Sequence, residues 1–152
     1  MTADLASQLH LDNQLCFKLY AASRAVIRAY KPMLDTLGLT YPQYLVMLVL
    51  WEWQVAAPAQ PTLKALGQRL QLDSGTLTPL LKRLQQLGLV HRQRAEQDER
   101  AVHLGLSEAG RLLQRQAAVL KARLLCQYQE AELREMEALR QRLDHLLARL
   151  SA

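Results

Sequence analysis

Residues 72–106 constrain this chain more than any other stretch, because they join one amphipathic helix to two short alternating segments. Asp73 and Ser74 are short polar residues that suit a helix N-cap, and Gly88 suits the left-handed position that ends a helix. Pro79 is compatible with a helix if it lies within about the first turn, since proline lacks a backbone donor. We therefore predict a helix over residues 74–87. Its apolar face consists of Leu77, Leu80, Leu81, Leu84 and Leu87.

Two alternating segments follow, at residues 89–93 and 101–106, and the charged run 94–100 joins them. This pattern predicts a β-hairpin over residues 89–106 with a charged tip. A helix with a short-polar N-terminus before a charged hairpin is typical of a winged helix-turn-helix, whose helix enters the DNA major groove while its wing reaches phosphates or the minor groove. An ordinary amphipathic helix with a solvated hairpin is the alternative, because helix-turn-helix patterns are degenerate.

Composition favours a single, mostly helical domain. The 152 residues are enough to bury about two thirds of the unfolded surface, and leucine dominates a chain with only six glycines. The net charge of +5 is compatible with a nucleic-acid partner. Residues 1–14 are too polar for a signal peptide, and the longest apolar run, residues 44–51, is too short to span a bilayer. We therefore expect a soluble, cytoplasmic protein without a membrane partner.

The pattern before residue 72 predicts several helices. The first is expected from residues 11–13 to about Lys31, with Asp12 as a cap and Pro32 as a break, followed by a short helix over 33–37. A helix over residues 42–53 is apolar almost all round and is expected to be the central buried element. A surface loop over 55–61 and a short amphipathic helix over 62–70 complete this part.

Two further helices are predicted after the hairpin. Ser107 begins the first, and a weak break at residues 128–131 separates it from the last. The apolar face of the first consists of Leu112, Leu113, Val119, Leu120, Leu124 and Leu125. The last carries a seam made of Leu133, Met136, Leu139, Leu143, Leu146 or Leu147, and Leu150. So long a seam at the chain end favours dimerisation, with packing inside its own chain as the alternative.

These patterns together predict a mainly α fold, a winged helix-turn-helix with N- and C-terminal helices that form a dimerisation region. In this single domain, residues 11–35 and 107–150 are the dimerisation helices. Residues 42–106 form the winged helix-turn-helix, with the reading helix at 74–87 and the wing at 89–106.

Cys16 is a candidate reactive thiol, because a helix that starts near Asp12 places it where the positive end of the helix dipole favours a thiolate. Such a thiolate reacts with peroxides to give a sulfenic acid, which a second thiol can trap. Tyr20 can reach Cys16 within one helix, but Tyr30 is about 21 Å further along and could serve the thiol only from an antiparallel partner chain. A buried structural cysteine is the alternative.

Four segments of the chain resemble the organic hydroperoxide resistance repressors of the MarR family. They are LDNQLCFKLYAASR, LTYPQYLVMLVLWE, LDSGTLTPLLKRLQQLGLV and the DER of the predicted wing. The resemblance extends from about Leu11 to about Leu147, and the motif around the cysteine is the one that distinguishes this group from other MarR-type regulators. It implies a homodimeric repressor that binds a palindromic operator in double-stranded DNA and releases it when the N-terminal cysteine is oxidised by an organic hydroperoxide.

The resemblance also implies roles for individual residues. Cys16 would be the sensing thiol, Tyr30 and Tyr41 would support it from the other subunit, and Tyr20 would lie near it. Cys126, in the helix after the wing, would be the resolving thiol of an intersubunit disulfide. The DNA-facing residues would be Ser74, Thr76, Thr78 and Lys82 on the reading helix and Asp98 and Arg100 in the wing. Arg83, Arg92 and Arg94 add phosphate attraction.

Two other functions fit parts of the pattern. A MarR-type regulator gated by a reversibly bound aromatic ligand would still respond after Cys16→Ser. A thiol peroxidase would consume far more than one equivalent of peroxide per thiol, but we see no further catalytic motif and expect no enzyme. The four histidines are scattered, so we expect no metal site and no cofactor.

Overall fold

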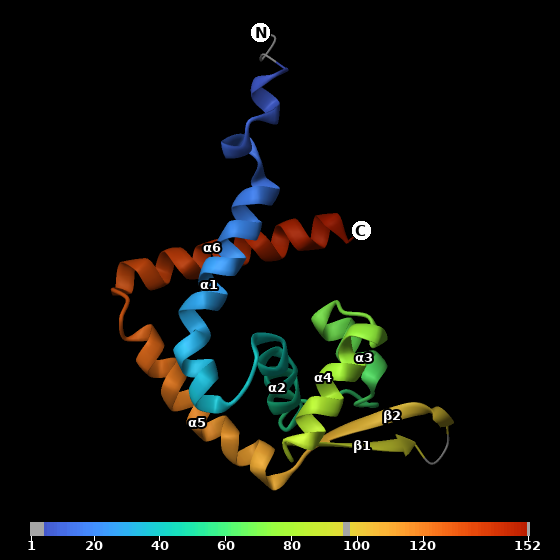
Figure 1. The fold of residues 1–152 in the computed structure, drawn as a ribbon. Helices are drawn as coiled ribbons and strands as arrows, with labels where there is room; N and C mark the ends of the chain where they lie inside the picture. Colours follow the sequence, from blue (N-terminus) through green and yellow to red (C-terminus); the bar gives the residue numbers. More distant parts are fainter. Residues whose placement is uncertain (1–4, 96–97, 152) are drawn as a thin grey trace.

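The computed structural model describes residues 5–95 and 98–151, apart from the side chains of residues 95–100, and shows a mainly helical fold with one two-stranded sheet (Figure 1). Two short 3-10 turns, Ser7–Leu9 and Leu11–Asn13, precede the first helix. The helices and strands are α1 (Leu15–Leu37), α2 (Tyr41–Trp53), α3 (Leu63–Leu70), α4 (Ser74–Gln86), β1 (Val90–Ala95), β2 (Asp98–Leu106), α5 (Glu108–Leu125) and α6 (Glu130–Leu150). This confirms the predicted fold class.

Helix α2 is the central buried element, as predicted. Thr40 and Gln43 form a capping box: the Gln43 N–H donates to Thr40 Oγ1 at 3.4 Å, and the Thr40 N–H donates to Gln43 Oε1 at 3.0 Å. Val46 and Met47 have no exposed surface, and seven of the thirteen residues of α2 are buried. Helices α3 and α4 and the hairpin pack around α2. Together with α2 they form a unit that we call the head.

Helices α3 and α4 form the helix-turn-helix. Gly67 in α3 lies so close to the connecting turn that a Cβ there would be 2.7 Å from the Leu72 carbonyl oxygen. In α4 the side chains of Leu77, Leu81 and Leu84 are fully buried, as predicted. Leu80 is only partly buried, and the prediction for Leu87 is wrong, since its side chain is 40% exposed beyond the end of the helix.

The placement of Pro79 in the first turn of the helix is also wrong, because α4 begins at Ser74 and Pro79 is its sixth residue. The backbone bond that Pro79 cannot donate would go to the carbonyl of Gly75, and both residues are exposed. Water can therefore satisfy that carbonyl, while the buried leucines hold the helix together.

The two strands of the hairpin are longer, and the loop between them is shorter, than predicted. β1 pairs antiparallel with β2, from Val90 opposite Leu106 to Arg94 opposite Val102, with a register shift after Arg94. Arg94, Asp98 and Arg100 therefore belong to strands rather than to the loop. Alternation of apolar and polar residues stops before residue 94, whereas the backbone ladder continues, and this is why the sequence pattern underestimated the strands.

Helix α1 corrects three expectations. It begins at Leu15 with Gln14 as N-cap, so Asp12 is not its cap, and it runs unbroken through Pro32 to Leu37. A proline inside a helix costs roughly 3 kcal/mol. Arg28, whose carbonyl loses its partner, is exposed, while Met33, Leu34 and Leu37 are buried in the core. Burial of these three side chains offsets that cost, and the separate helix predicted over 33–37 is the last part of α1.

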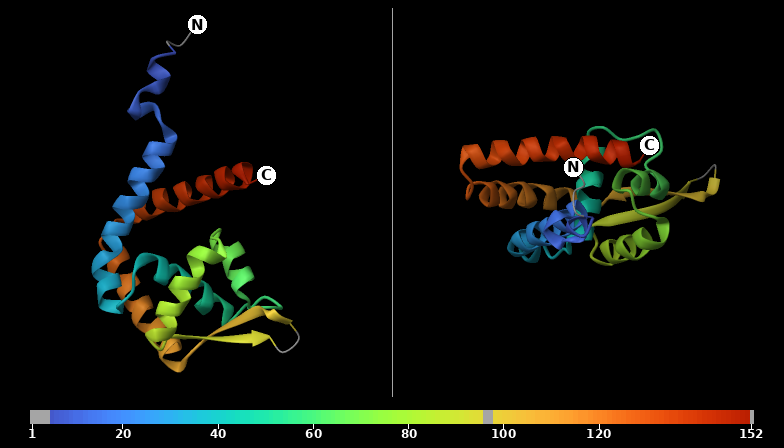
Figure 2. Two further views of the ribbon diagram at one scale, coloured as in Figure 1. Left: turned by 45° about the vertical axis from the view of Figure 1, so that its right-hand side comes forward. Right: turned by 90° about the horizontal axis from the view of Figure 1, so that it is seen from above.

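The N-terminal half of α1 extends away from α2, α3, α4 and the hairpin, whereas α6 turns back after α5 and runs above them (Figure 2). Only the last turns of α1 are buried, and α6 buries none of its residues against the rest of the described chain. The break before α6 lies at residues 126–129, slightly earlier than predicted. In α5 only Gly110 and Ala117 are buried, whereas Leu112, Val119 and Leu125 of the predicted apolar face are exposed. The apolar stripes on α1, α5 and α6 are therefore not covered by other described residues of the chain.

Among the described residues, no single helix is long and apolar enough to cross a membrane. Helices α1 and α2, which meet at a 72° bend, reach that length and composition only when they are taken together.

Candidate functional site

The outer face of α4 carries the polar residues that the sequence pattern placed there. All of them are exposed: Ser74, Thr76, Thr78, Lys82 and Arg83. The Thr78 hydroxyl donates to the Ser74 carbonyl at 2.7 Å, so this threonine is held against its own helix. One face of α4 is therefore fully packed, while the other presents hydroxyls and two cations to solvent.

Asp73 fixes the start of α4. Its carboxylate accepts from the Thr76 N–H at 2.7 Å, and this hydrogen bond lowers the pKa of the carboxyl group below its ordinary value of 3.8. Asp73 rather than Ser74 is thus the N-cap, which leaves the Ser74 side chain on the outer surface.

The hairpin adds further basic residues beside α4. Arg94 in β1 is exposed, and Arg92 donates from Nε to Gln85 Oε1 at 2.9 Å, which ties the wing to the end of α4. The predicted wing residues Asp98 and Arg100 lie in β2, but their side chains fall outside the described part of the structure.

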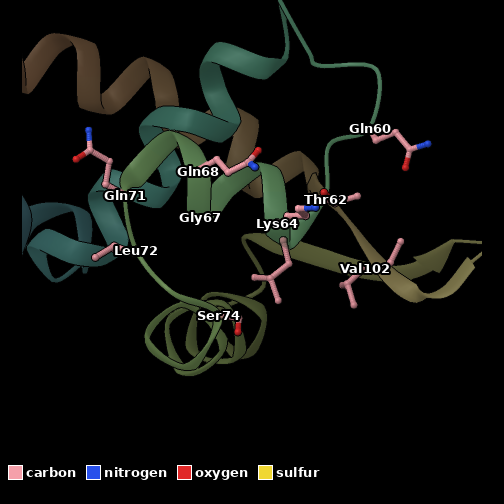
Figure 3. Close-up of a pocket in the computed structure, with 11 residues that line it drawn as sticks. Gln60, Thr62, Lys64, Gly67, Gln68, Gln71, Leu72, Ser74 and Val102 are labelled. Carbon is pink, nitrogen blue, oxygen red and sulfur yellow. The ribbon is translucent and has the colours of Figure 1, made fainter. Parts of the chain in front are cut away.

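An open cleft of about 840 Å³ lies between α3, the start of α4 and the hairpin (Figure 3). Its lining combines apolar and polar side chains, with Lys64 as the charged residue among Gln60, Gln68 and Gln71. Ser74 reaches this cleft from α4 and Val102 from β2. The cleft thus lies beside both α4 and β2 of the wing.

Cys16 is exposed in the first turn of α1. Within the part of the chain that the structure describes, no group forms a hydrogen bond to its thiol. Asp12 and Lys18 form an exposed ion pair of 3.4 Å nearby in the sequence. Tyr20, one turn further on, is 62% exposed and has the Arg24 guanidinium 5.4 Å from its ring centre. The alternative of a buried structural cysteine does not hold for this single chain.

Tyr30 and Tyr41 lie at the other end of α1, where it packs on the head. Tyr30 from α1 and Tyr41 and Tyr44 from α2 form a cluster with ring centres 6.2–6.4 Å apart. Burial raises the pKa of Tyr44, and the neighbouring Tyr41 adds to that effect. The structure therefore brings two of the predicted supporting tyrosines together, but places them away from Cys16 of their own chain.

Lys121 from α5 completes this cluster. Its ammonium donates a hydrogen bond to the Tyr30 phenol oxygen and lies 4.2 Å from the ring centre. Burial lowers the pKa of Lys121. Sequence reasoning missed both Tyr44 and Lys121. The spacing of Tyr41 and Tyr44, three residues apart on one helix face, could have indicated the former. A contact across 91 residues left no sequence pattern for the latter.

Cys126 is the C-cap of α5 and is exposed. Both cysteines are free thiols, and the single chain does not bring them together. A bond between Cys16 and Cys126 would therefore have to join two chains, as the family resemblance implied.

A second cavity, of about 500 Å³, lies between α2 and α5 and is lined mainly by apolar side chains. Tyr44, Trp51 and Lys121 contribute to its wall. Trp51 is fixed by donation from its indole N–H to the Gly110 carbonyl at 2.8 Å. Among the described residues, no group of three or more histidine, cysteine, aspartate or glutamate side chains could hold a metal ion.

Comparison with known proteins places these features in a family. The family model described as transcriptional regulator SarA/Rot matches residues 28–116, which is more than half of the chain. The organic hydroperoxide resistance transcriptional regulator of Bacillus subtilis is 50% identical over 117 residues, which cover 77% of this chain and 76% of that protein.

Solved structures of the regulator AbfR, known from Staphylococcus epidermidis, are similar over nearly the whole chain. Reduced AbfR bound to DNA is 38% identical, covers 93% of this chain and 98% of its own, and has a TM-score of 0.72. Overoxidised AbfR bound to DNA has the same identity and coverage and a TM-score of 0.71. Disulfide-formed AbfR is 36% identical, covers 95% of this chain and 94% of its own, and has a TM-score of 0.66.

Proposed function

Since the chain belongs to the MarR/SarA family of winged-helix transcriptional regulators, we propose that it is a homodimeric, peroxide-sensing repressor in the cytoplasm. In the reduced state it binds a palindromic operator in double-stranded DNA. It releases the operator when Cys16 is oxidised by an organic hydroperoxide. The likeness to a hydroperoxide resistance regulator at 50% identity supports the oxidant, and the likeness to reduced AbfR bound to DNA supports the operator complex.

The surface of α4 and the wing is the proposed DNA interface. In a dimer with DNA, two copies of α4 would occupy successive major grooves about 34 Å apart. Ser74, Thr76 and Thr78 would meet the DNA through their hydroxyls, while Lys82 and Arg83 add charge. The wing would contribute Arg94, Asp98 and Arg100. Basic side chains at this surface attract phosphates and fix the position of the helix, and contacts to base edges select the sequence.

The dimerisation region is proposed to comprise residues 11–35 and 107–150, with residues 42–106 as the winged helix-turn-helix. The uncovered apolar stripes of α1 and α6 support this division, because a second chain would bury them. If the two α1 helices run antiparallel, Cys16 of one chain approaches Tyr30 and Tyr41 of the other. This arrangement would supply the phenol donors that the thiol lacks in the single chain.

The proposed redox step begins with attack of the Cys16 thiolate on the outer oxygen of a hydroperoxide. The O–O bond breaks, the alkoxide takes up a proton and leaves as the alcohol, and Cys16 becomes a sulfenic acid. The partner's Cys126 thiol then attacks this sulfur, so that a disulfide forms and water leaves. Overoxidised AbfR is bound to DNA in its crystal structure, which favours the disulfide as the releasing state in this chain.

The exposed thiol of Cys16 in the first turn of α1 is the observation that carries this proposal. Reduced protein bound to the DNA upstream of its own coding region should lose that DNA after one equivalent of cumene hydroperoxide. A covalent dimer that dithiothreitol reverses should appear at the same time on a non-reducing gel. Cys16→Ser should still bind DNA and ignore the peroxide, and Cys126→Ser should be oxidised without forming the covalent dimer.

The same titration separates the proposal from its two rivals. Peroxide consumption that continues far beyond one equivalent per Cys16 would identify a thiol peroxidase instead. The cavity between α2 and α5 supports the other candidate, a regulator gated by a reversibly bound aromatic ligand. Release of DNA from the Cys16→Ser protein by such a ligand would identify that function, and a normal peroxide response of Cys16→Ser would refute the sensor assignment.

A further inference from the structure

Lys121 is the charged residue of the tyrosine cluster, and the proposed function gives it no role. It lies on α5, yet its ammonium reaches across to Tyr30 on α1. Among the described residues it forms no salt bridge, and Glu52, which lines the same cavity, pairs with Arg69 at 3.2 Å. A partly buried cation whose hydrogen-bond partner is a neutral phenol is costly unless a further anion offsets it.

The direction of the Lys121–Tyr30 hydrogen bond determines what Tyr30 can do. An ammonium group has donors only, so the phenol oxygen of Tyr30 is the acceptor, and its own proton remains free for another acceptor. Among the described residues of this chain, no acceptor for that proton is present. A phenol that accepts from a cation is also a stronger donor, because successive hydrogen bonds polarise one another.

We propose that Lys121 is a positioning residue for the peroxide-sensing thiol: it fixes Tyr30 so that the phenol proton points to the Cys16 thiolate of the partner subunit. The inference rests on the proposed function, which places Tyr30 beside the partner's thiol. The thiolate is the anion that offsets the Lys121 charge. The ring contacts of Tyr30 with Tyr41 at 6.3 Å and Tyr44 at 6.2 Å hold the phenol in place from the α2 side.

The test compares Lys121→Met with Arg123→Met in a Cys126→Ser background, where Cys16 is the single thiol. Both substitutions remove one positive charge from α5, but Arg123 is exposed and does not contact the cluster. The first measurement is the pH profile of Cys16 alkylation by iodoacetamide, and the second is the rate of oxidation by cumene hydroperoxide. Tyr30, Tyr41, Tyr44 and Glu52 are the titratable groups around Lys121, and both variants retain all four.

We expect Lys121→Met to move the alkylation profile to higher pH and to slow oxidation about tenfold, as for removal of one hydrogen bond to a charged group. Lys121→Arg should restore most of the rate, since guanidinium also donates to a phenol, and Arg123→Met should match the parent. Because Lys121 acts through Tyr30, the double variant Tyr30→Phe, Lys121→Met should be no slower than Tyr30→Phe alone.

An unchanged alkylation profile and rate in Lys121→Met would overturn the inference, and so would additive effects in the double variant. Neither result would contradict the proposed function, because that function depends on Cys16 itself. Conversely, a Cys16→Ser protein that still responds to peroxide refutes the proposed function and the inference with it. Gel filtration of each variant checks that it folds. The Tyr30→Phe variant tests whether the effect of Lys121 on the thiol passes through the Tyr30 phenol.

Discussion

Asp73 shows how one side chain fixes the start of the proposed reading helix. Its hydrogen bond from the Thr76 N–H favours the charged carboxylate, which is why its pKa lies below the ordinary value of 3.8. A lowered folded-state pKa contributes stability above the unfolded pKa, and that stability is lost as pH falls through the folded value. The cap should therefore hold α4 at neutral pH and release it in acid.

We predict that Asp73→Ala lowers the thermal midpoint at pH 7 and that its difference from the parent shrinks below about pH 4, the region where a carboxylate cap is protonated. Asp73→Asn should retain most of the cap at pH 7, because asparagine caps about as well as aspartate, and should show no such step in acid. Thermal melts from pH 7 to pH 2 measure both. A constant difference between Asp73→Ala and the parent across this range would contradict the prediction.

Some of the candidate site residues could be predicted from the sequence, and others could not. The outward residues of α4 were predictable, because helical periodicity fixes which side chains oppose Leu77, Leu81 and Leu84. Cys16 and Tyr30 were assigned from motif and spacing. Lys121 was not, because its role depends on how α5 crosses α1, and no local pattern encodes a crossing.

Among the secondary-structure elements, α6 buries none of its residues against the rest of the described chain. Its seam leaves Leu139 55% exposed and Leu147 46% exposed, and we propose that a second chain covers them. The pattern predicted this helix correctly, and the role of its seam in dimerisation stays a prediction. The continuous α1 was predicted less well, because tertiary burial of Met33 and Leu34 overrides the local effect of Pro32. The strands were predicted too short, because the alternation of apolar and polar residues stops before the backbone ladder does.

We predict that Leu139→Lys with Leu143→Lys on the α6 seam converts the dimer to monomers, since lysines in an apolar seam are costly to bury. Without paired binding, operator affinity should weaken by about 10²-fold to 10⁴-fold. Sedimentation and a DNA shift assay measure the two effects. Ala138→Lys with Gln141→Lys adds the same charge to the other face of α6 and should stay dimeric. If the seam variant also stays dimeric, α6 is not part of the dimer interface.

The whole molecule combines a basic surface with two widely separated functional ends. The chain has a net charge of +5, so a dimer of two chains would carry twice that. The proposed DNA surface lies on α4 and the wing, whereas the thiol lies on the uncovered half of α1. Among the described residues no hydrogen bond or ion pair joins the two sites, so we propose that an event at the thiol alters DNA binding through the relative placement of the two heads.

This arrangement makes the salt dependence of binding a test of the DNA surface. Removing one lysine–phosphate interaction from each protomer should flatten the slope of log affinity against log salt concentration by about 0.9, and therefore by about 1.8 for a symmetric dimer. We predict this change for Lys82→Gln, whose side chain is exposed on α4, in titrations of reduced protein with operator DNA from 50 to 200 mM KCl.

Lys31→Gln serves as the control, because Lys31 lies on α1 and pairs with Asp35 at 2.7 Å, away from the proposed surface. Its slope should equal that of the parent, although the net charge of the chain changes equally in both variants. If Lys82→Gln and Lys31→Gln flatten the slope to the same extent, the attraction comes from overall charge, and α4 does not contact the phosphates as proposed. A change confined to Lys82→Gln assigns the phosphate interaction to α4, because only that variant removes a cation from the surface that faces the DNA.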